Sequence, residues 1–228
     1  MSLETFPHIV QGTDEWLELR RGLLTASTVG QLITPKTIQV SNTAKTRMLI
    51  YELVAETITG EVEEPFVSWD MMRGTLDEPF ARQYYAENYA PVTELGFMRL
   101  TVPGRDGYQL GYSPDGLVGD EGLIEIKSRA PKKHLQTILS QEVPAENMAQ
   151  LQAGLLVSGR DWIDYISFCG GMPLWVKRVY PVQKWRHAII NAARLVADET
   201  RRYTASYMTA IAGFPKTEKP DHHQEIRI

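Results

Sequence analysis

The spacing of apolar residues along the chain changes from a helical interval to a strand-like interval and back again. Over residues 44–58 the interval is three or four, which is typical of an amphipathic helix with one face against a core. From Val92 the interval shortens towards two, as in strands whose side chains alternate between the faces of a sheet. The pattern therefore predicts a mixed α/β protein.

Capping residues, glycines and prolines divide this pattern into elements. The expected helices cover residues 13–22, 44–58, 68–85, 145–157 and 182–211, with a bend into a further short helix over 23–33. The expected strands cover residues 92–100, 108–112, 123–127, 162–169 and 174–180, and the first three are expected to form an antiparallel meander. Residues 34–43 are expected to form a polar loop, and Pro79 must lie near a first helical turn or cause a kink.

Length and composition indicate one domain. The chain has 228 residues, 43% of them hydrophobic, which is long enough for one α/β core and short for two. We expect a single mixed-sheet domain over residues 1–213 and a mobile polar tail over residues 214–228. Cys169 is the only cysteine, which excludes an internal disulfide and a cysteine-based metal site. We find neither a signal-like start nor an apolar run of bilayer length, so we expect a cytoplasmic protein.

The charge balance gives no global attraction to nucleic acid, because the formal net charge is −4. Any DNA contact must therefore come from local groups of cations. The densest group is Arg129, Lys132, Lys133 and His134, which is either a solvated helix start or a track for phosphates. Three further cations border the predicted polar loop, namely Lys36, Lys45 and Arg47.

Two carboxylates and an ammonium group stand close together between residues 111 and 128. Glu125 lies inside an apolar run and Lys127 follows two residues later, so both project from one face of the predicted strand. Asp115 precedes Glu125 by ten residues, and a turn at residues 119–122 lets a hairpin return its carboxylate beside Glu125. Such a pair repels unless it binds a divalent cation such as Mg²⁺ or Mn²⁺, which keeps water and substrate phosphate as further ligands. Lys127 can then lower the pKa of a metal-adjacent water or hold that water for attack.

Each part of this segment also has a purely structural interpretation. Pro-Asp-Gly is an ordinary turn tripeptide, and Glu-x-Lys is a common surface pair. The combination of both, with Glu-x-Lys inside an apolar strand, favours a metal-dependent nuclease site.

A candidate anion site lies nearer the N-terminus. The predicted helix over residues 13–22 carries acids in its first turn and Arg20 and Arg21 in its last. Thr25 and Ser27 follow, and hydroxyls with free backbone N–H groups at a helix start bind anions. Plain N-capping is the alternative role for these two hydroxyls.

Two more polar positions have open assignments. Glu78 is either a carboxylate at a helix start or an acid that faces the metal site. Gln150 and Gln152 bracket the apolar stripe of the helix over residues 145–157, where glutamine is usually an ordinary hydrogen-bonding residue. Gln150 follows the strand of Glu125 and Lys127 along the chain, and its alternative role is therefore to hold the attacking water.

Five motifs follow one another in the order WLELRRGLLTAS, GTLDE, SPDG, LIEIK and MAQLQ, at residues 16–27, 74–78, 113–116, 123–127 and 148–152. In this order they resemble the phage lambda exonuclease family of viral recombinases, the YqaJ-type alkaline exonucleases of the PD-(D/E)xK nuclease superfamily. The motifs span more than half of the chain. The resemblance implies a restriction-endonuclease-like α/β core with flanking helices.

The same resemblance implies an activity. Members would use Mg²⁺, or Mn²⁺ in its place, to degrade the 5′ strand of linear duplex DNA from a 5′-phosphate end. They would release mononucleotides and leave a 3′ overhang for a single-strand annealing protein. A ring-shaped homotrimer around DNA and a phage or prophage origin in a bacterial host are also implied. In such a ring we expect the channel to be lined by cations drawn from Lys36, Lys45, Arg47, Arg129, Lys132 and Lys133.

The resemblance also assigns roles to individual residues. Asp115 and Glu125 would be metal ligands together with the carbonyl of Ile126, and Lys127 would activate the water.

The remaining assignments concern orientation and DNA. Glu78 and Gln150 would help to orient the water or the metal shell. The residues that would hold the terminal 5′ phosphate or the adjoining DNA are Arg20, Thr25, Ser27 and Ser113.

Two other functions remain open at this point. An endonuclease of restriction or repair type can use the same fold, but a pocket for an end phosphate argues against it. An inactive DNA-end binding module is the other alternative, and the complete set of competent residues at the metal site argues against that one.

Overall fold

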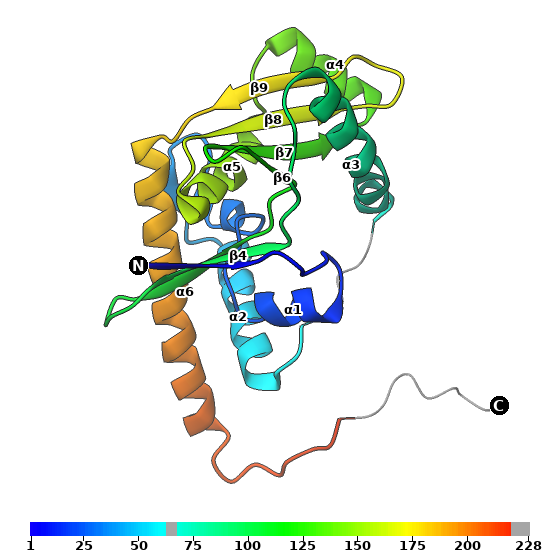
Figure 1. The fold of residues 1–228 in the computed structure, drawn as a ribbon. Helices are drawn as coiled ribbons and strands as arrows, with labels where there is room; N and C mark the ends of the chain where they lie inside the picture. Colours follow the sequence, from blue (N-terminus) through cyan, green and yellow to red (C-terminus); the bar gives the residue numbers. More distant parts are fainter. Residues whose placement is uncertain (63–67, 220–228) are drawn as a thin grey trace, which may run out of the picture.

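Two β-sheets form the frame of the protein, and helix α5 packs against both of them (Figure 1). The computed structural model describes residues 1–62 and 68–219. The first sheet is antiparallel in the order β1–β4–β5, with strands Ser2–Phe6, Phe97–Val102 and Tyr108–Tyr112. The second has the order β6–β7–β8–β9, with strands Gly116–Val118, Gly122–Ser128, Trp162–Phe168 and Trp175–Val179. Strands β7 and β8 run parallel, and α4 (Pro131–Ser140) and α5 (Ala145–Ser158) form the crossover between them.

The predicted meander is wrong in its pairing, although all three of its strands exist. Strands β4 and β5 form a hairpin, but β5 does not pair with β7, because β6 and β8 occupy both edges of β7. The chain leaves the first sheet after Tyr112, and Pro114 lacks the N–H that a continuing ladder requires. The strand predicted over residues 92–100 begins only at Phe97. Strand β1, which pairs with β4, is an element that the pattern does not predict.

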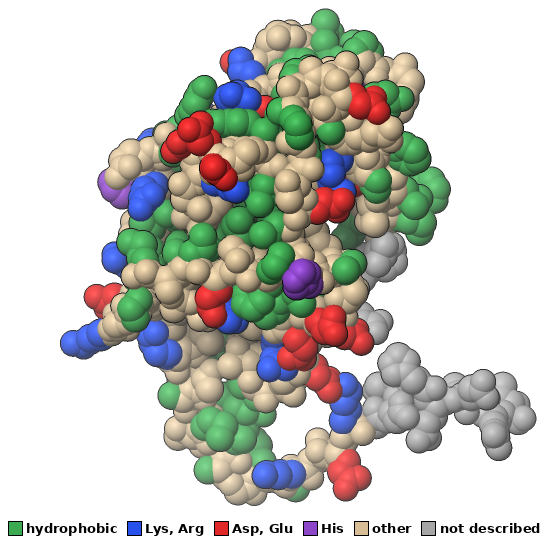
Figure 2. All heavy atoms as spheres, viewed as in Figure 1, with side chains coloured by type: hydrophobic (Ala, Val, Ile, Leu, Met, Phe, Trp, Pro, Cys, Tyr) green, Lys and Arg blue, Asp and Glu red, His purple; other side chains and the backbone are tan. Residues whose placement is uncertain are grey.

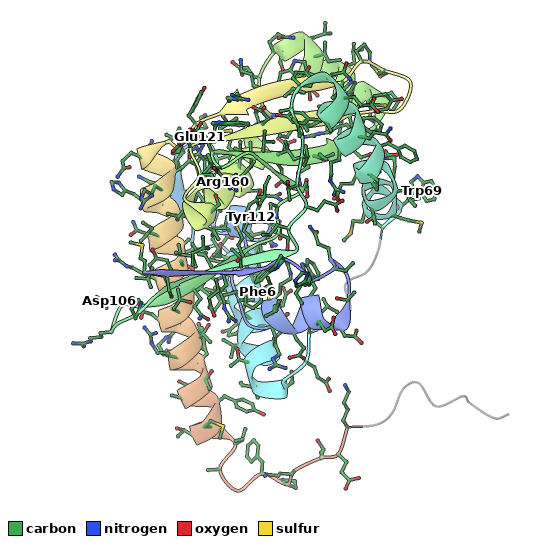
Figure 3. All side chains as sticks on the ribbon, viewed as in Figure 1. Phe6, Trp69, Asp106, Tyr112, Glu121 and Arg160 are labelled. Atoms are coloured by element: carbon green, nitrogen blue, oxygen red, sulfur yellow. The ribbon has the colours of Figure 1, made fainter. Side chains whose placement is uncertain are left out.

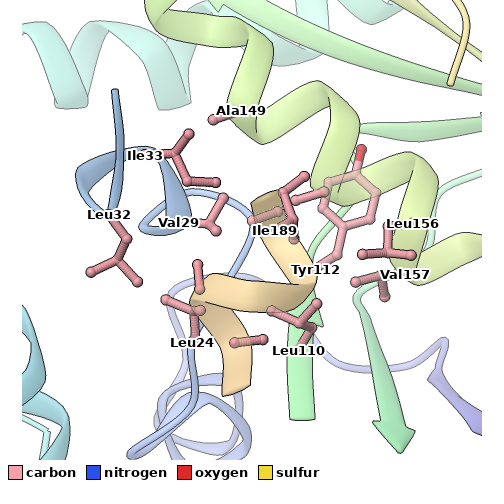
Figure 4. Packing of buried hydrophobic residues seen from close by; sticks show 14 of the residues in the cluster. Leu24, Val29, Leu32, Ile33, Leu110, Tyr112, Ala149, Leu156, Val157 and Ile189 are labelled. Carbon is pink, nitrogen blue, oxygen red and sulfur yellow. The ribbon is translucent and has the colours of Figure 1, made fainter. Parts of the chain in front are cut away.

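Helix α5 fills the space between the sheets with apolar side chains (Figure 4). Tyr112 of β5 belongs to this core, is only 1% exposed and lies near the centre of the molecule (Figure 3). A Cβ on Gly154 of α5 would come within 2.8 Å of the Tyr112 ring, so glycine allows the helix to approach this closely. The close approach brings α5 against the strand that leads to Asp115.

Helix α3 (Trp69–Asn88) covers the opposite face of the second sheet. Its residues Ala81 and Tyr85 are buried against β7 and β8. The Tyr85 hydroxyl donates to Asp164 Oδ2 at 2.6 Å, and Arg178 donates two hydrogen bonds of 2.8 Å to the same carboxylate. The buried acid is thus paired and hydrogen-bonded, which fixes α3 on the sheet.

The predicted helices in the N-terminal half exist, with one difference inside α3. Helix α1 (Asp14–Arg20) begins after the capping hydroxyl of Thr13. Helix α2 (Ala44–Thr59) ends at Gly60, whose left-handed conformation has φ +74°. Pro79 lies in the middle of α3 instead of near its first turn, so of the two predicted alternatives the place near a first turn is excluded, and the kink stays a prediction.

Residues 23–33 do not form the predicted second helix. Only the 3₁₀ turn η1 (Val29–Gln31) is helical. The Thr28 hydroxyl accepts from the Thr25 N–H, a local bond that competes with helical pairing. Gly111 of β5 exchanges backbone hydrogen bonds with this segment and holds it extended against the sheet. The predicted polar loop also carries a small antiparallel pair, β2 (Ile33–Thr34) and β3 (Gln39–Val40).

The long helix predicted near the C-terminus is α6 (Gln183–Ala210). Its buried residues follow a helical spacing and include Trp185, Ile189, Ala192, Ala193 and Val196. Residues 214–219 are exposed and have no regular secondary structure, and the rest of the predicted tail lies outside the described residues. Of the helices that the structure describes, none is long and apolar enough to cross a bilayer.

Candidate active site

The hairpin of β6 and β7 places Asp115 beside Glu125. Its turn contains Gly119, which has φ +53°, a conformation that glycine adopts without strain. Asp115 immediately precedes β6, and its Oδ2 accepts a hydrogen bond from the Ile126 N–H at 2.6 Å. The backbone of β7 therefore fixes the carboxylate of Asp115 next to that of Glu125.

Glu125, Lys127 and Gln150 form one hydrogen-bonded group. The strand period of two places Glu125 and Lys127 on one face of β7, and Lys127 Nζ lies 2.8 Å from Glu125 Oε1. Gln150 faces them from α5: its Oε1 accepts from Lys127 Nζ at 3.0 Å, and its Nε2 donates to Glu125 Oε1. The Tyr112 hydroxyl lies 3.4 Å from Glu125 Oε2. Because Glu125 is only 1% exposed, these donors compensate a charge that has left water.

Glu78 adds a third carboxylate from α3. It lies in the middle of that helix, so it is not the helix-start acid of the first alternative. Burial raises the pKa of Asp115 well above its usual value, and repulsion from Glu125 and Glu78 adds to this rise. Burial also raises the pKa of Glu78, opposed by the attraction of Arg82. The three acids therefore share one electrostatic environment in which their negative charges repel.

Lys127 keeps its positive charge inside this group. Burial alone would lower its pKa, but the carboxylates of Glu125 and Asp115 outweigh burial and raise the pKa above its ordinary value. An ammonium with a raised pKa does not take a proton from water at neutral pH. It can orient a water molecule by hydrogen bonding or stabilise negative charge as it develops. Both roles predicted for Lys127, lowering the pKa of a metal-adjacent water and holding that water for attack, are compatible with a charged ammonium at this place.

The oxygen donors here suit a hard divalent cation. No hydrogen-bond donor of the described residues reaches Asp115 Oδ1, and a cation there would offset the carboxylate repulsion. Within the described ranges, no group of three His, Cys, Asp or Glu side chains is arranged to hold a metal ion. Asp115, Glu125 and the Ile126 carbonyl would therefore leave several positions to water and substrate phosphate, which is the coordination that Mg²⁺ favours.

Arg20, Thr25 and Ser27 converge in a second group. Arg20 Nη2 lies 3.3 Å from Ser27 Oγ and 3.5 Å from Thr25 Oγ1, and the two hydroxyls are 3.0 Å apart. Burial lowers the pKa of Arg20 to about 10, so the guanidinium remains charged at neutral pH. A partly desolvated guanidinium with two hydroxyls suits a phosphate. The helix start expected at this place is absent, so the candidate phosphate site consists of side chains without backbone N–H groups of a helix.

Trp16 joins this group and is not among the predicted site residues. The Arg20 guanidinium lies over its ring, 4.0 Å from the ring centroid. Its Nε1 donates to Ser113 Oγ at 2.8 Å, and Ser113 stands two residues before Asp115. Trp16 thus links the two groups. The signal for it was the spacing of four residues to Arg20, which puts both side chains on one face of α1.

One cavity of about 490 Å³ contains both groups. Every predicted site residue except Thr25 lines it, namely Arg20, Ser27, Glu78, Ser113, Asp115, Glu125, Ile126, Lys127 and Gln150. Thr25 is buried behind Ser27 and Arg20 and contacts both. A larger cavity of about 970 Å³ lies between α3 and residues 168–174, and of its lining residues only Asp77 is acidic or basic. The smaller cavity is therefore the candidate active site.

The basic cluster after β7 is divided between two environments. Lys132 and Lys133 are exposed at the start of α4. The Arg129 side chain is only 11% exposed and donates to the Tyr165 hydroxyl at 2.8 Å. His134 is fully buried, with both ring nitrogens hydrogen-bonded. Protein contacts already hold the Arg129 guanidinium, so the two exposed lysines are the stronger candidates for a DNA channel, and the place of Arg129 in such a channel stays a prediction.

This chain is similar to a known protein family and to solved structures. The pattern of the YqaJ-like viral recombinase domain matches residues 15–161, more than half of the chain. An alkaline exonuclease (LHK-Exo) from Laribacter hongkongensis is 30% identical with a TM-score of 0.74, over 88% of this chain and 98% of that chain. Its complex with dAMP is 31% identical with a TM-score of 0.75 over the same shares. No curated protein sequence matches this chain.

A more distant structure shows the same fold. A phage related exonuclease from Haemophilus somnus has a TM-score of 0.60 at 10% identity, over 82% of this chain and 96% of that chain. Together with the alkaline exonuclease, it confirms the predicted fold class, a single-domain mixed α/β core of the PD-(D/E)xK type.

Proposed function

Because the chain belongs to the YqaJ-like viral recombinase domain family, we propose that it is a Mg²⁺-dependent exonuclease that degrades the 5′ strand of linear duplex DNA. The observation that carries the proposal is the single cavity with both a carboxylate and lysine group and an arginine and hydroxyl group. The first group suits cleavage of a phosphodiester, and the second suits the terminal phosphate of a strand. An enzyme that anchors the end phosphate beside its cleavage site removes short units from that end. The related alkaline exonuclease is known in complex with dAMP, a mononucleotide, which supports release of 5′ mononucleotides.

The residues of the first group have complementary tasks. Asp115, Glu125 and the Ile126 carbonyl would hold Mg²⁺, or Mn²⁺ in its place. When bound, this cation polarises the scissile phosphate and lowers the pKa of water. The Lys127 ammonium orients the attacking water and stabilises negative charge on the phosphate. Gln150 forms hydrogen bonds with Lys127 and with Glu125 at the same time, so it fixes the Lys127 ammonium relative to the Glu125 carboxylate.

The remaining site residues address the shell and the DNA end. Glu78 approaches the acid pair from α3 and would orient water in the metal shell. The arginine and hydroxyl group of Arg20, Thr25 and Ser27 would bind the 5′ phosphate with charge-assisted hydrogen bonds. Ser113, held by Trp16, would contact the adjoining DNA backbone.

We also infer that the protein works as a ring-shaped homotrimer and leaves a 3′ overhang for a single-strand annealing protein, in the cytoplasm of a bacterium that carries the phage or prophage. The net charge is −4, and on the face shown in Figure 2 Lys and Arg are interspersed with Asp and Glu. Such a surface attracts duplex DNA weakly. Encirclement would keep the enzyme on its substrate without strong attraction.

One assay separates the proposal from its alternatives. End-labelled linear duplex with a 5′ phosphate or a 5′ hydroxyl is digested with and without Mg²⁺, beside a closed circular plasmid. We expect mononucleotides from the 5′ end, only with Mg²⁺ and faster from the phosphorylated end, while the circle stays intact. Cleavage of the circle would indicate an endonuclease. Binding of ends without cleavage would indicate an inactive end-binding module.

A further inference from the structure

Arg82 is the cation that joins three separate parts of the chain next to the acid pair. It lies on α3 one turn after Glu78, and its side chain is 17% exposed. Its Nε donates to the backbone carbonyl of Asp115 at 2.8 Å, and its Nη2 donates to Glu78 Oε1. Its Nη1 lies 2.8 Å from Glu94 Oε2. One planar guanidinium therefore uses all three of its nitrogens on acceptors from α3, from the segment before β6 and from the segment before β4.

These contacts complete the support of Asp115. Its side chain is held by the Ile126 N–H, and its main-chain carbonyl is held by Arg82. The same guanidinium grips the carboxylate of Glu78. Arg82 therefore fixes the distance between a residue of the hairpin and a residue of α3, two elements that no strand pairing connects.

We propose that Arg82 is a positioning residue that holds Glu78 and the Asp115 main chain in register, so that the Asp115 carboxylate stands at the divalent cation and Glu78 faces the water shell of that cation. The proposal rests on the proposed function, because it concerns the metal group of the same cavity. Arg82 does not line that cavity and does not touch the reacting atoms. It acts through the ligands, as outer-shell partners of metal ligands do.

The fork shape of the guanidinium is central to this role. Nε and Nη2 lie on fixed directions of one plane and can serve the Asp115 carbonyl and the Glu78 carboxylate together. A lysine at residue 82 would keep the positive charge, but its single ammonium lacks this fork. A charge effect and a positioning effect can therefore be separated by substitution.

The exposed arm of the fork provides a matched control. Glu94 is 73% exposed, and its ion pair with Arg82 lies in water, where such pairs contribute little. Glu94→Gln removes this arm and leaves the two inner contacts intact. We expect this variant to bind Mg²⁺ and cleave DNA within about twofold of the wild type.

The experiment compares the wild type with Arg82→Met, Arg82→Lys and Glu94→Gln. Mg²⁺ binding to the DNA-free protein is measured by titration calorimetry, kcat and KM are measured on linear duplex, and thermal unfolding is followed separately. For Arg82→Met we expect the Kd for Mg²⁺ to rise and kcat to fall, each by about 10- to 100-fold, with KM for DNA within about threefold. Arg82→Lys keeps the charge and the fold, and we expect it to recover only a small part of the loss.

Four outcomes would overturn the proposal. If Arg82→Met unfolds at a lower temperature but binds Mg²⁺ as the wild type does, Arg82 only stabilises the fold. Full recovery in Arg82→Lys would show that charge suffices and that position is irrelevant. If the wild type itself binds no Mg²⁺ and cleaves no DNA, the proposed function fails, and this role fails with it. If the wild type binds Mg²⁺ and cleaves DNA, and Arg82→Met does so equally well, only the role of Arg82 is rejected.

Discussion

Asp115 Oδ2 lies 2.6 Å from the backbone nitrogen of Ile126, the residue that follows Glu125 in β7. The distance between the two acids is thus set by the backbone of a hairpin and by a main-chain donor. Side-chain rotamers alone would allow the acids to separate and lower their repulsion. Because the backbone holds them together, the fold maintains a concentration of negative charge that a cation can neutralise.

The first prediction concerns this acid. Asp115→Asn should reduce Mg²⁺-dependent cleavage by at least about 10³-fold, because loss of a metal ligand removes several kcal/mol of transition-state stabilisation. The asparagine oxygen can still accept from the Ile126 N–H. Without metal, the variant should unfold at no lower temperature than the wild type, since one repelling charge is gone. Near-normal cleavage in Mg²⁺ would disprove the metal assignment, and a large loss of stability would disprove the repulsion.

The second prediction concerns Lys127. Lys127→Met should lower kcat by about 10²- to 10⁴-fold, because a group that orients water and stabilises developing charge contributes by that amount. Mg²⁺ binding, measured by calorimetry, should be changed much less. Lys127→Arg should also fail, because the guanidinium fork cannot replace a compact ammonium between Glu125 and Gln150. Full activity of the arginine variant would refute this role.

The features of the site that could be predicted from the sequence are those that depend on near neighbours. The period of a strand suffices to put Glu125 and Lys127 on one face. A glycine turn suffices to predict the hairpin that returns Asp115. Both predictions agree with the structure.

The predictions that failed depend on partners far away in the chain. The pairing of β1 with β4 joins residues more than ninety positions apart, and nothing local marks it. The pattern of residues 23–33 fits a helix, but backbone bonds to Gly111 hold the segment extended. Arg82 and Trp16 were missed as site residues for the same reason, since their contacts with Asp115 and Ser113 span 33 and 97 positions.

The third prediction concerns the end phosphate. Arg20→Gln should reduce cleavage of 5′-phosphorylated ends by about 10- to 150-fold, the equivalent of a charge-assisted bond of about 1.5 to 3 kcal/mol. Cleavage of 5′-hydroxyl ends should change much less, so the ratio between the two ends shrinks.

Arg21 is the matched control for this substitution. It is the next residue, but its guanidinium donates to Glu18 and to the Gly60 carbonyl instead of the hydroxyls of Thr25 and Ser27. Arg21→Gln should leave the ratio between phosphorylated and hydroxyl ends unchanged. If both variants alter the ratio equally, the effect is one of general charge, and the phosphate assignment for Arg20 is wrong.

The fourth prediction separates a buried cation from exposed ones. Arg129→Met should lower the free energy of unfolding by about 1 to 3 kcal/mol, because the Tyr165 hydroxyl loses a charged donor in a partly buried place. A double substitution of Lys132 and Lys133 to glutamine should change it by less than about 0.5 kcal/mol per residue. For DNA binding the order should reverse, with a shallower salt dependence only in the lysine variant. If Arg129→Met is as stable as the wild type, the structural role of Arg129 is wrong, and Arg129 is again a candidate for DNA contact.

The last prediction concerns assembly. Light scattering should give a mass about three times the 25.8 kDa of one chain, because we infer a ring of three subunits. A protein with a net charge of −4 binds duplex DNA weakly by attraction alone, whereas a closed ring cannot leave until the strand ends. Digestion of a long duplex should therefore continue after an excess of competitor ends is added. The rate at which digestion starts should fall steeply as the salt concentration rises, because binding of the ring to a DNA end depends on phosphate contacts. Once the ring encloses the duplex, these contacts are no longer needed to keep it there. A monomer that competitor DNA stops at once would refute the ring, and would leave the assignment of Asp115, Glu125 and Lys127 standing.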